Sequence, residues 1–200
     1  SWNVNEGAAC LPNSAAHPGD RHPYQQLAFD TLRNQLLLYG GVCAGIPFTD
    51  TWSWAAVNGV WTERPTTTNP GPRYEAAMAY SAAADRHVLY GGLRLGPVMA
   101  ETWVFNPAAD TWQLAATTGN PGPRAGHGMV YDSLRQRVVL FGGYSVYGGP
   151  LSNEVWLYDA ATAAWTNPQP PVKPPPVAYP GMAYDPVRAK VVLYAGPADT

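Results

Sequence analysis

Residues 137–143 read "RVVLFGG", and closely related stretches stand at three other places: "QLLLYGG" (35–41), "RHVLYGG" (86–92) and "KVVLYAG" (190–196). The first glycine position falls at residues 40, 91, 142 and 195, so the spacings are 51, 51 and 53 residues. An aliphatic, β-branched run that stops at glycine is typical of a strand that enters a sharp turn. The fixed period indicates an array of similar structural units.

Each unit reads as four short strands separated by turn residues. In the third unit they are predicted at 126–132, 137–143, 154–159 and 163–167. The first strand recurs at 26–30, 76–80 and 180–185, and the third recurs at 50–54 and 101–105. Connections this short between the first and second strands, and between the third and fourth, favour antiparallel hairpins.

A helix is the alternative interpretation of "LAFDTLRNQLLLY" (27–39), which by itself has an amphipathic pattern. Its counterpart in the last unit, "MAYDPVRAKVVLY" (182–194), carries Pro186 in the middle and paired valines after it. Proline breaks a helix interior, and β-branched residues favour strands. The strand interpretation is therefore preferred.

Four-stranded units of this kind bury both faces when they pack radially, which predicts an all-β protein with the β-propeller architecture. Residues 1–5 are expected to form a lone fourth strand, and the last unit contains only two predicted strands. We therefore expect a partial propeller, a segment of a larger ring of about 6–8 blades. The predicted division is 1–21 (end of a preceding blade and a long loop), 22–72, 73–123, 124–176 and 177–200 (partial).

Composition excludes several classes of function. Only 13% of the residues are charged and the formal net charge is −2, which disfavours nucleic-acid binding. No apolar run approaches the roughly 18 residues that span a bilayer, so no membrane span is predicted. The eight Trp and twelve Tyr argue against disorder, despite the many Gly and Pro residues.

The double glycine after an aliphatic strand, with Trp late in a unit of about 50 residues, resembles the kelch repeat. The segments "HGMVYDSLRQRVVLFGG" (127–143) and "NEVWLYD" (153–159) are most similar to the repeats of bacterial secreted kelch proteins. The resemblance covers about residues 22–200 and implies a propeller that binds partners with its loop face. Our first hypothesis is a non-catalytic scaffold that binds a protein or glycan partner and needs no cofactor, because the sequence shows no catalytic motif.

Two other functions stay open from the residues. Copper-radical oxidases similar to galactose oxidase also carry kelch-type blades, but their set of two Tyr, two His and a crosslinked Cys does not map onto the four His of this chain. A structural or assembly role, in which the open ends associate with further blades or chains, is the third hypothesis.

Binding residues are expected on the long loops, because loops on a rigid scaffold carry most binding sites. The loops between the second and third strands (42–49, 93–100, 144–153) and the inter-repeat loops (62–73, 113–124, 166–177) must share one face. We call it the loop face, and the opposite side with the short hairpin turns the turn face. The predicted binding residues are Arg73, Arg124, His22, Arg94, Tyr144 and Tyr147.

Arg73 and Arg124 each close the motif "NPGPR", and His22 and Val177 occupy the same place by the repeat period. Arginine can bind a carboxylate through two parallel hydrogen bonds. The alternative interpretation is that these arginines cap loop carbonyls and fix the rim of the propeller.

Other recurring residues are expected to be structural. Asp50, Glu101 and Glu154 precede the third strand in register and are predicted to cap backbone amides rather than to form a ring of acids. Six of the tryptophans recur at fixed strand positions (52, 61, 103, 112, 156 and 165), which predicts packing between blades rather than a sugar-binding stack.

Cys10 and Cys43 are the only cysteines, and both lie in loops of the same blade on the same face. A disulfide between them is predicted, which would favour an extracellular or cell-surface location. His17, Asp20 and His22 could form a metal site with Cys10, but their spacing matches no established motif, so no metal is expected. His87 and His127 have no obvious partner, and the chain contains no nucleophile-elbow, zinc-protease or P-loop motif.

Overall fold

The computed structural model describes residues 10, 12–14, 16–22, 24 and 26–195. The strand predicted at residues 1–5 lies outside the described residues. Every regular element in the described part of the chain is a β-strand, as the all-β prediction requires. No helix there is long and apolar enough to cross a membrane.

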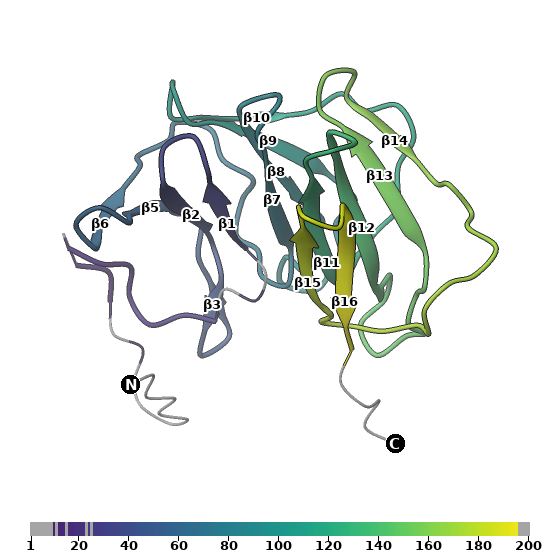
Figure 1. Cartoon of the computed structure of the whole chain (residues 1–200). Coiled ribbons are helices and arrows are strands. Elements are labelled where there is room, and N and C mark those ends of the chain that lie inside the picture. The colour runs from purple at the N-terminus through teal and green to yellow at the C-terminus, as the bar shows by residue number, and fades with distance from the viewer. Residues whose placement is uncertain (1–9, 11, 15, 23, 25, 196–200) are drawn as a thin grey trace.

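Three antiparallel sheets of four strands make up most of the structure (Figure 1). The first contains β1 (Leu27–Asp30), β2 (Gln35–Tyr39), β5 (Thr51–Ala55) and β6 (Val60–Glu63). The second contains β7 (Ala77–Ser81), β8 (Arg86–Tyr90), β9 (Thr102–Asn106) and β10 (Thr111–Leu114). The third contains β11 (Ala125–Asp132), β12 (Arg137–Tyr144), β13 (Val155–Asp159) and β14 (Ala164–Thr166).

Two smaller sheets complete the described elements. The fourth repeat contributes the antiparallel pair β15 (Gly181–Asp185) and β16 (Lys190–Tyr194). The short strands β3 (Val42–Cys43) and β4 (Ile46–Pro47) form a hairpin in the loop that follows β2.

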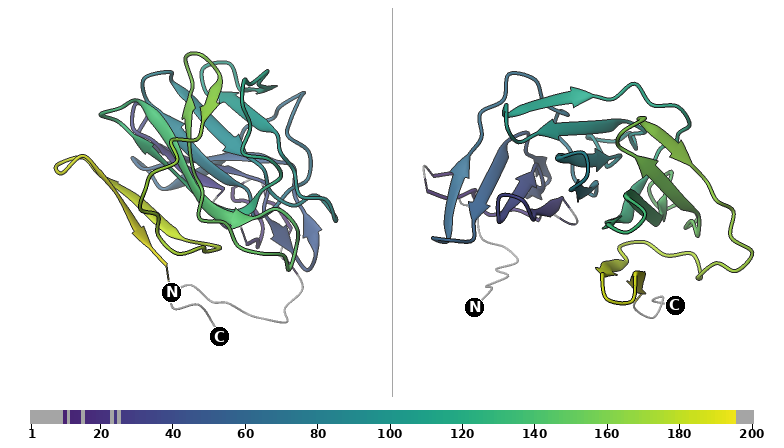
Figure 2. Two further views of the ribbon diagram at one scale, coloured as in Figure 1. Left: turned by 90° about the vertical axis from the view of Figure 1, so that its right-hand side faces the viewer. Right: turned by 45° about the horizontal axis from the view of Figure 1, so that its top comes forward.

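The sheets follow one another around an arc, with the first strand of each repeat on the inside (Figure 2, right). The inner strands β1, β7, β11 and β15 are neighbours in that order, and each sheet continues outward to its fourth strand. This confirms the predicted partial β-propeller. The radial arrangement brings the loops of different repeats together at the inner edge.

The core consists of the layers between neighbouring blades. The fourth-strand tryptophans carry much of this packing: the Trp112 Nε1 donates to Thr51 Oγ1 at 2.9 Å, and the Trp165 Nε1 donates to Thr102 Oγ1 at 2.9 Å. Each crosses to the preceding blade, where its ring meets a tyrosine edge-on, as Trp112 meets Tyr39 with ring centroids 5.0 Å apart. The prediction of packing between blades is confirmed for these two positions.

The double glycines hold the blades at close distance. In the first three repeats both glycines have positive φ, with Gly91 at 64° and Gly92 at 94°. A Cβ on Gly91 would lie 2.1 Å from the backbone oxygen of Arg124 in the next repeat. The recurring glycines are therefore required both by the left-handed backbone and by the approach of the next blade.

Two buried histidines make stability depend on pH. Burial lowers the pKa of His87 to about 4 and that of His127 to about 3, so both are neutral in the folded chain at neutral pH. The unfolded chain takes up these protons below about pH 6.5, so stability is full above that pH and falls as the pH drops towards the folded pKa values. We expect a loss of about 3 kcal/mol between pH 7.5 and pH 5.5.

Urea unfolding at the two pH values measures this loss. The double variant His87→Gln/His127→Gln should remove most of the pH dependence, whereas His17→Gln, at an exposed position, should leave it unchanged. An unaltered pH dependence in the double variant would show that other groups cause it.

Candidate binding surface on the loop face

Backbone hydrogen bonds between repeats bring the two sets of long loops together. The amide of Gly41 donates to the carbonyl of Arg73 at 3.1 Å, and the amide of Gly92 donates to that of Arg124 at 2.9 Å. The amide of Gly143 donates to the carbonyl of Val177 at 2.8 Å. The loops after β2, β8 and β12 therefore share one face with the inter-repeat loops, as predicted.

The NPGPR arginines lie under this face, where each joins its inter-repeat loop to the ends of the second and third strands of its repeat. Arg73 is fully buried: its Nη1 donates to the carbonyl of Gly91 at 3.0 Å, and its Nη2 donates to Glu101 Oε2 at 2.9 Å and to the carbonyl of Pro70. These partners occupy both Nη atoms, which favours the interpretation that the residue fixes the rim.

Arg124 repeats this arrangement one blade further on. Its guanidinium donates to the carbonyl of Gly142 at 3.0 Å, to the carbonyl of Pro121 at 3.0 Å and to Glu154 Oε2 at 2.6 Å. Only 6% of the residue is exposed, so it presents little surface to a partner. The fourth repeat has Val177 at this place and lacks the arginine.

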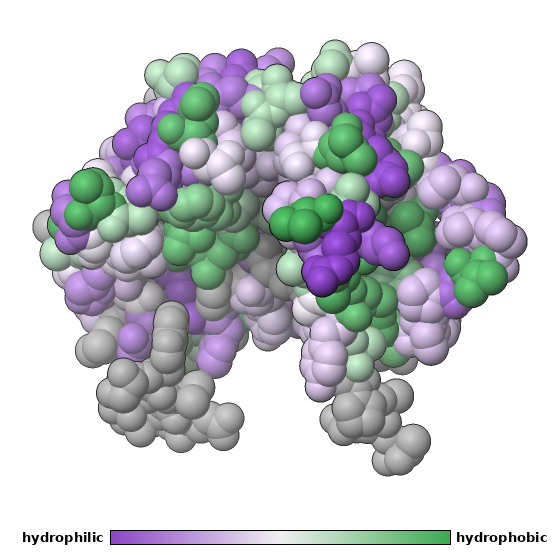
Figure 3. Space-filling view, in the orientation of Figure 1, coloured by the Kyte–Doolittle hydropathy of each residue, from purple (hydrophilic) through white to green (hydrophobic). Residues whose placement is uncertain are grey.

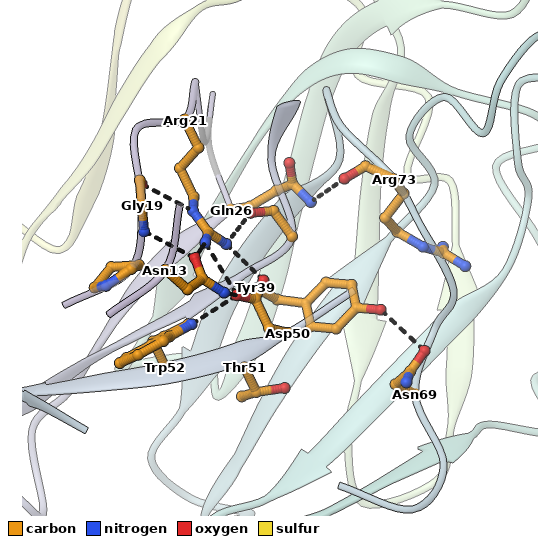
Figure 4. Close-up of polar contacts among 12 residues, drawn as sticks. Asn13, Gly19, Arg21, Gln26, Tyr39, Asp50, Thr51, Trp52, Asn69 and Arg73 are labelled. Atoms are coloured by element: carbon orange, nitrogen blue, oxygen red, sulfur yellow. Dashed lines mark hydrogen bonds and ion pairs between the residues drawn. The ribbon is translucent and has the colours of Figure 1, made fainter. Parts of the chain in front are cut away.

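In the first repeat this role belongs to Arg21 and not to His22 (Figure 4). The Nη1 of Arg21 donates to the carbonyl of Gly40 at 3.0 Å and to Asp50 Oδ1 at 2.5 Å. In the second and third repeats, the residue with positive φ (Glu75 or Gly126) comes two residues after the arginine. In the first repeat, Tyr24 comes three residues after Arg21, and the repeat period therefore points to His22 instead. His22 is exposed, and its backbone pairs with Val42.

The recurring acids complete the same arrangement. Asp50, Glu101 and Glu154 each accept a hydrogen bond from the indole two residues later, with Trp103 Nε1 2.9 Å from Glu101 Oε2. Burial opposes ionisation of Glu101, but the bonds from Trp103 and Arg73 outweigh it and lower the pKa of Glu101. The acids are structural, yet their partners are an indole and an arginine rather than the predicted backbone amides.

At the inner edge of the loop face, five tyrosines from four repeats come together, and we call them the tyrosine cluster: Tyr24, Tyr74, Tyr144, Tyr147 and Tyr179. Tyr24 of the first repeat stacks on Tyr179 of the fourth, with ring centroids 5.8 Å apart, and lies 6.2 Å from Tyr74. Tyr144 meets Tyr147 edge-on at 6.1 Å and Tyr179 at 6.5 Å. These ring contacts form a continuous row that joins the four repeats.

Glu75 lies beneath this row and is only 5% exposed. The hydroxyl of Tyr144 donates to its Oε2. Burial, followed by the charge of Glu75, raises the pKa of Tyr24 and of Tyr74. The pKa of Tyr179 is raised by burial and also by Glu75. The Glu75 carboxylate therefore contributes to the raised pKa of tyrosines from three repeats.

The structure thus separates the predicted binding residues into two groups. Tyr144 and Tyr147 belong to the tyrosine cluster, although the ring of Tyr144 is mostly buried and that of Tyr147 is exposed. Arg94 is exposed and its guanidinium lies over Gly71, where a Cβ would be 3.2 Å from Cζ. Arg73 and Arg124 serve the blades instead.

Sequence reasoning missed Tyr24, Tyr74, Glu75 and Tyr179. They lie in three of the four equivalent triplets "HPY" (22–24), "RYE" (73–75), "RAG" (124–126) and "VAY" (177–179), which begin where the repeat period places the arginine. The signal that could have found them is variation: these are equivalent positions at which the repeats differ chemically, whereas residues that recur in every repeat are mostly structural.

An apolar hollow of about 400 Å³ lies among the inner strands of the four repeats. Inner-strand residues such as Leu27, Phe29, Met129 and Tyr184 line it, and Figure 3 shows hydrophobic side chains beside this region. Its lining also includes Thr31 and Ser133 of the hairpin turns, so it opens towards the turn face. The tyrosine cluster therefore lies at the opposite, loop-face end of the inner strands.

The described residues contain no group of three or more His, Cys, Asp or Glu that could hold a metal ion. Cys10 and Cys43 form the predicted disulfide, with Cα atoms 6.0 Å apart. Neither sulfur is then available to bind a metal together with His17 and His22. Neither is available for the crosslink to tyrosine that a copper-radical site requires.

Comparison with known proteins identifies similar chains. The family described as KLHDC2/KLHL20/DRC7 Kelch-repeats domain matches residues 26–199. The Rab9 effector protein with kelch motifs of Xenopus laevis is 26% identical over 187 residues, which are 92% of this chain and 50% of the relative. An F-box/kelch-repeat protein of Arabidopsis thaliana is 33% identical over 140 residues, 62% of this chain and 28% of the relative.

A further relative is Host cell factor 2 of Homo sapiens, which is 30% identical over 145 residues, 70% of this chain and 18% of that protein. The chain therefore spans half or less of the length of these relatives, all of which are eukaryotic.

Proposed function

The chain belongs to the kelch-repeat family, and on that premise we propose that it is a non-catalytic, protein-binding propeller whose loop face contacts the partner. One of its relatives is named as an effector of Rab9, a name that describes a protein acting through another protein. A binding role requires no cofactor and no catalytic residues, only an accessible surface on a rigid support.

The observation that carries this proposal is the tyrosine cluster. Tyr24, Tyr147 and Tyr179 expose 43%, 74% and 49% of their surfaces on the loop face. Tyrosine supplies a large apolar contact area with a polar end at small entropic cost, and it is enriched where proteins bind one another. Tyr24 and Tyr179 occupy a repeat position that holds Glu75 and Gly126 in the other two repeats, so the blades themselves do not require tyrosine there.

Affinity isolation with matched variants tests the proposal. The chain is immobilised in four forms: unchanged, Tyr147→Ser, Arg94→Ala, and the turn-face control Leu134→Ser, whose leucine is 66% exposed. We expect a protein that binds the unchanged chain and the control with equal, saturable affinity and binds Tyr147→Ser at least about tenfold more weakly, because an exposed aromatic anchor dominates such contacts.

Equal affinity of all four forms would contradict the loop-face assignment. A glycan partner is the other predicted ligand, since tyrosine rings also pack on sugars. The same four proteins on a glycan array would identify it, and glycan binding without protein binding would overturn the protein assignment.

We further propose that the protein is secreted or displayed at the cell surface. The disulfide between Cys10 and Cys43 supports this location, because structural disulfides persist mainly in oxidising compartments. The resemblance to bacterial secreted kelch proteins points the same way.

A further inference from the structure

Glu75 is a buried carboxylate without a cationic partner. Among the residues that the structure describes, the ion pairs involve other acids, and no arginine, lysine or histidine nitrogen pairs with Glu75. Its neighbours are tyrosines, one of which donates a hydrogen bond to it. A buried carboxylate is costly unless it is paired, so this arrangement leaves attraction for a positive charge unused.

The rings above Glu75 provide a second attraction for a cation. The rings of Tyr74 and Tyr179 lie beside that of Tyr24, with centroids 6.2 Å and 5.8 Å from it, respectively. The face of an aromatic ring is electronegative and attracts a cation within about 6 Å of its centroid. The chain makes such a contact internally, since Arg21 Cζ lies 4.1 Å from the ring centroid of Phe48.

The backbone conformation at this place is common to all four repeats, but the side chains are not. Tyr24, Glu75, Gly126 and Tyr179 have φ of 50°, 57°, 63° and 53°. Bulky residues rarely adopt this left-handed conformation. A Cβ on Gly126 would lie 3.0 Å from the Tyr144 ring and 3.2 Å from the Tyr179 ring. Glycine in the third repeat therefore leaves space for the rings of the cluster.

We propose that the tyrosine cluster and Glu75 together form a docking site for an arginine side chain presented by the partner protein. This inference rests on the proposed loop-face function. A planar guanidinium can lie flat against the partly exposed rings of Tyr24 and Tyr179, which the compact ammonium of lysine cannot do. The Glu75 carboxylate and the hydroxyls of the rings supply the electrostatic complement.

The test is an NMR titration of the tyrosine-labelled chain with the peptide acetyl-Gly-Gly-Arg-Gly-Gly-amide. Its neutral counterpart, in which citrulline replaces arginine, has nearly the same shape and lacks the charge. We expect the arginine peptide to shift tyrosine ring signals saturably and to bind at least about tenfold more tightly than the citrulline peptide, because cation–π and charge attraction both require the positive charge.

Two variants and a control assign the effect to the site. Glu75→Gln keeps the shape of the side chain and should weaken the binding of the arginine peptide about fivefold or more, because it removes the negative charge. Tyr147→Ser changes a residue that is 74% exposed, so it should weaken binding without loss of the fold. Glu63→Gln, an exposed acid at the end of β6, should leave the affinity unchanged.

Equal binding of the two peptides, or unchanged binding to both Glu75→Gln and Tyr147→Ser, would overturn the arginine site. If the arginine peptide shifts no tyrosine signal while Tyr147→Ser still loses its protein partner, the site assignment fails and the proposed function stands. If the arginine peptide binds Glu75→Gln and Tyr147→Ser as it binds the unchanged chain, and the protein partner also binds Tyr147→Ser with unchanged affinity, both proposals fail.

Discussion

A Gly91→Ala substitution is expected to cost about 3–5 kcal/mol of the free energy of unfolding, from the strain of a left-handed residue and a steric clash. Gly91 has φ of 64°, and its added methyl would lie 2.1 Å from the backbone oxygen of Arg124. That oxygen accepts the amide of Gly92 at 2.9 Å, so it cannot withdraw without breaking the contact between the second and third blades.

Gly59 provides a matched control for this substitution. Its φ is 68°, close to that of Gly91, but a Cβ there would meet nothing within 4 Å. Gly59→Ala should therefore cost only the conformational part, about 1 kcal/mol. Urea unfolding of both variants measures the difference, and similar losses in the two would contradict the close approach of the blades.

An Arg73→Met substitution is expected to cost about 3–5 kcal/mol, because it breaks a buried charged network. Methionine replaces the length of the side chain but none of the hydrogen bonds. The carbonyls of Gly91 and Pro70 lose their donor, and Glu101 retains only the indole of Trp103 from this group.

The control is a partly exposed arginine pair of the same chain, Arg64 and Asp110. Arg64 Nη2 lies 2.7 Å from Asp110 Oδ1, but 27% of the Arg64 side chain and 40% of that of Asp110 are exposed. Pairs of this kind contribute roughly 0–1 kcal/mol, so Arg64→Met should be nearly neutral. Thermal and urea unfolding compare the two variants, and a cost of Arg73→Met no larger than that of Arg64→Met would contradict its role between the loops.

The recurring residues explain why the fold could be predicted from the sequence. The period of the double glycines, the paired valines and Pro186 in the last repeat exclude a helix and place the hairpins. The strands at 137–143 and 154–159 accordingly coincide closely with β12 (Arg137–Tyr144) and β13 (Val155–Asp159). A local sequence pattern is enough to predict the strands because the same pattern recurs in each repeat.

The binding surface could be predicted only in part, because it depends on contacts between distant repeats. Tyr24 and Tyr179 are separated by most of the chain, and only the curvature of the arc stacks their rings. Likewise, Arg21 could not be recognised by period, since one additional residue shifts it from the place of Arg73. Arg73 itself looks like a ligand-binding residue in the sequence, and its burial beneath the loops is a property of the packed blades.

The most direct test of the loop-face assignment is site-specific photo-crosslinking to the partner that affinity isolation identifies. A benzophenone side chain is placed at Tyr147 on the loop face or at Leu134 on the turn face, both of which are well exposed. We predict that the partner crosslinks to the probe at position 147 and not to the probe at position 134. Crosslinking at 134 with none at 147 would contradict the account.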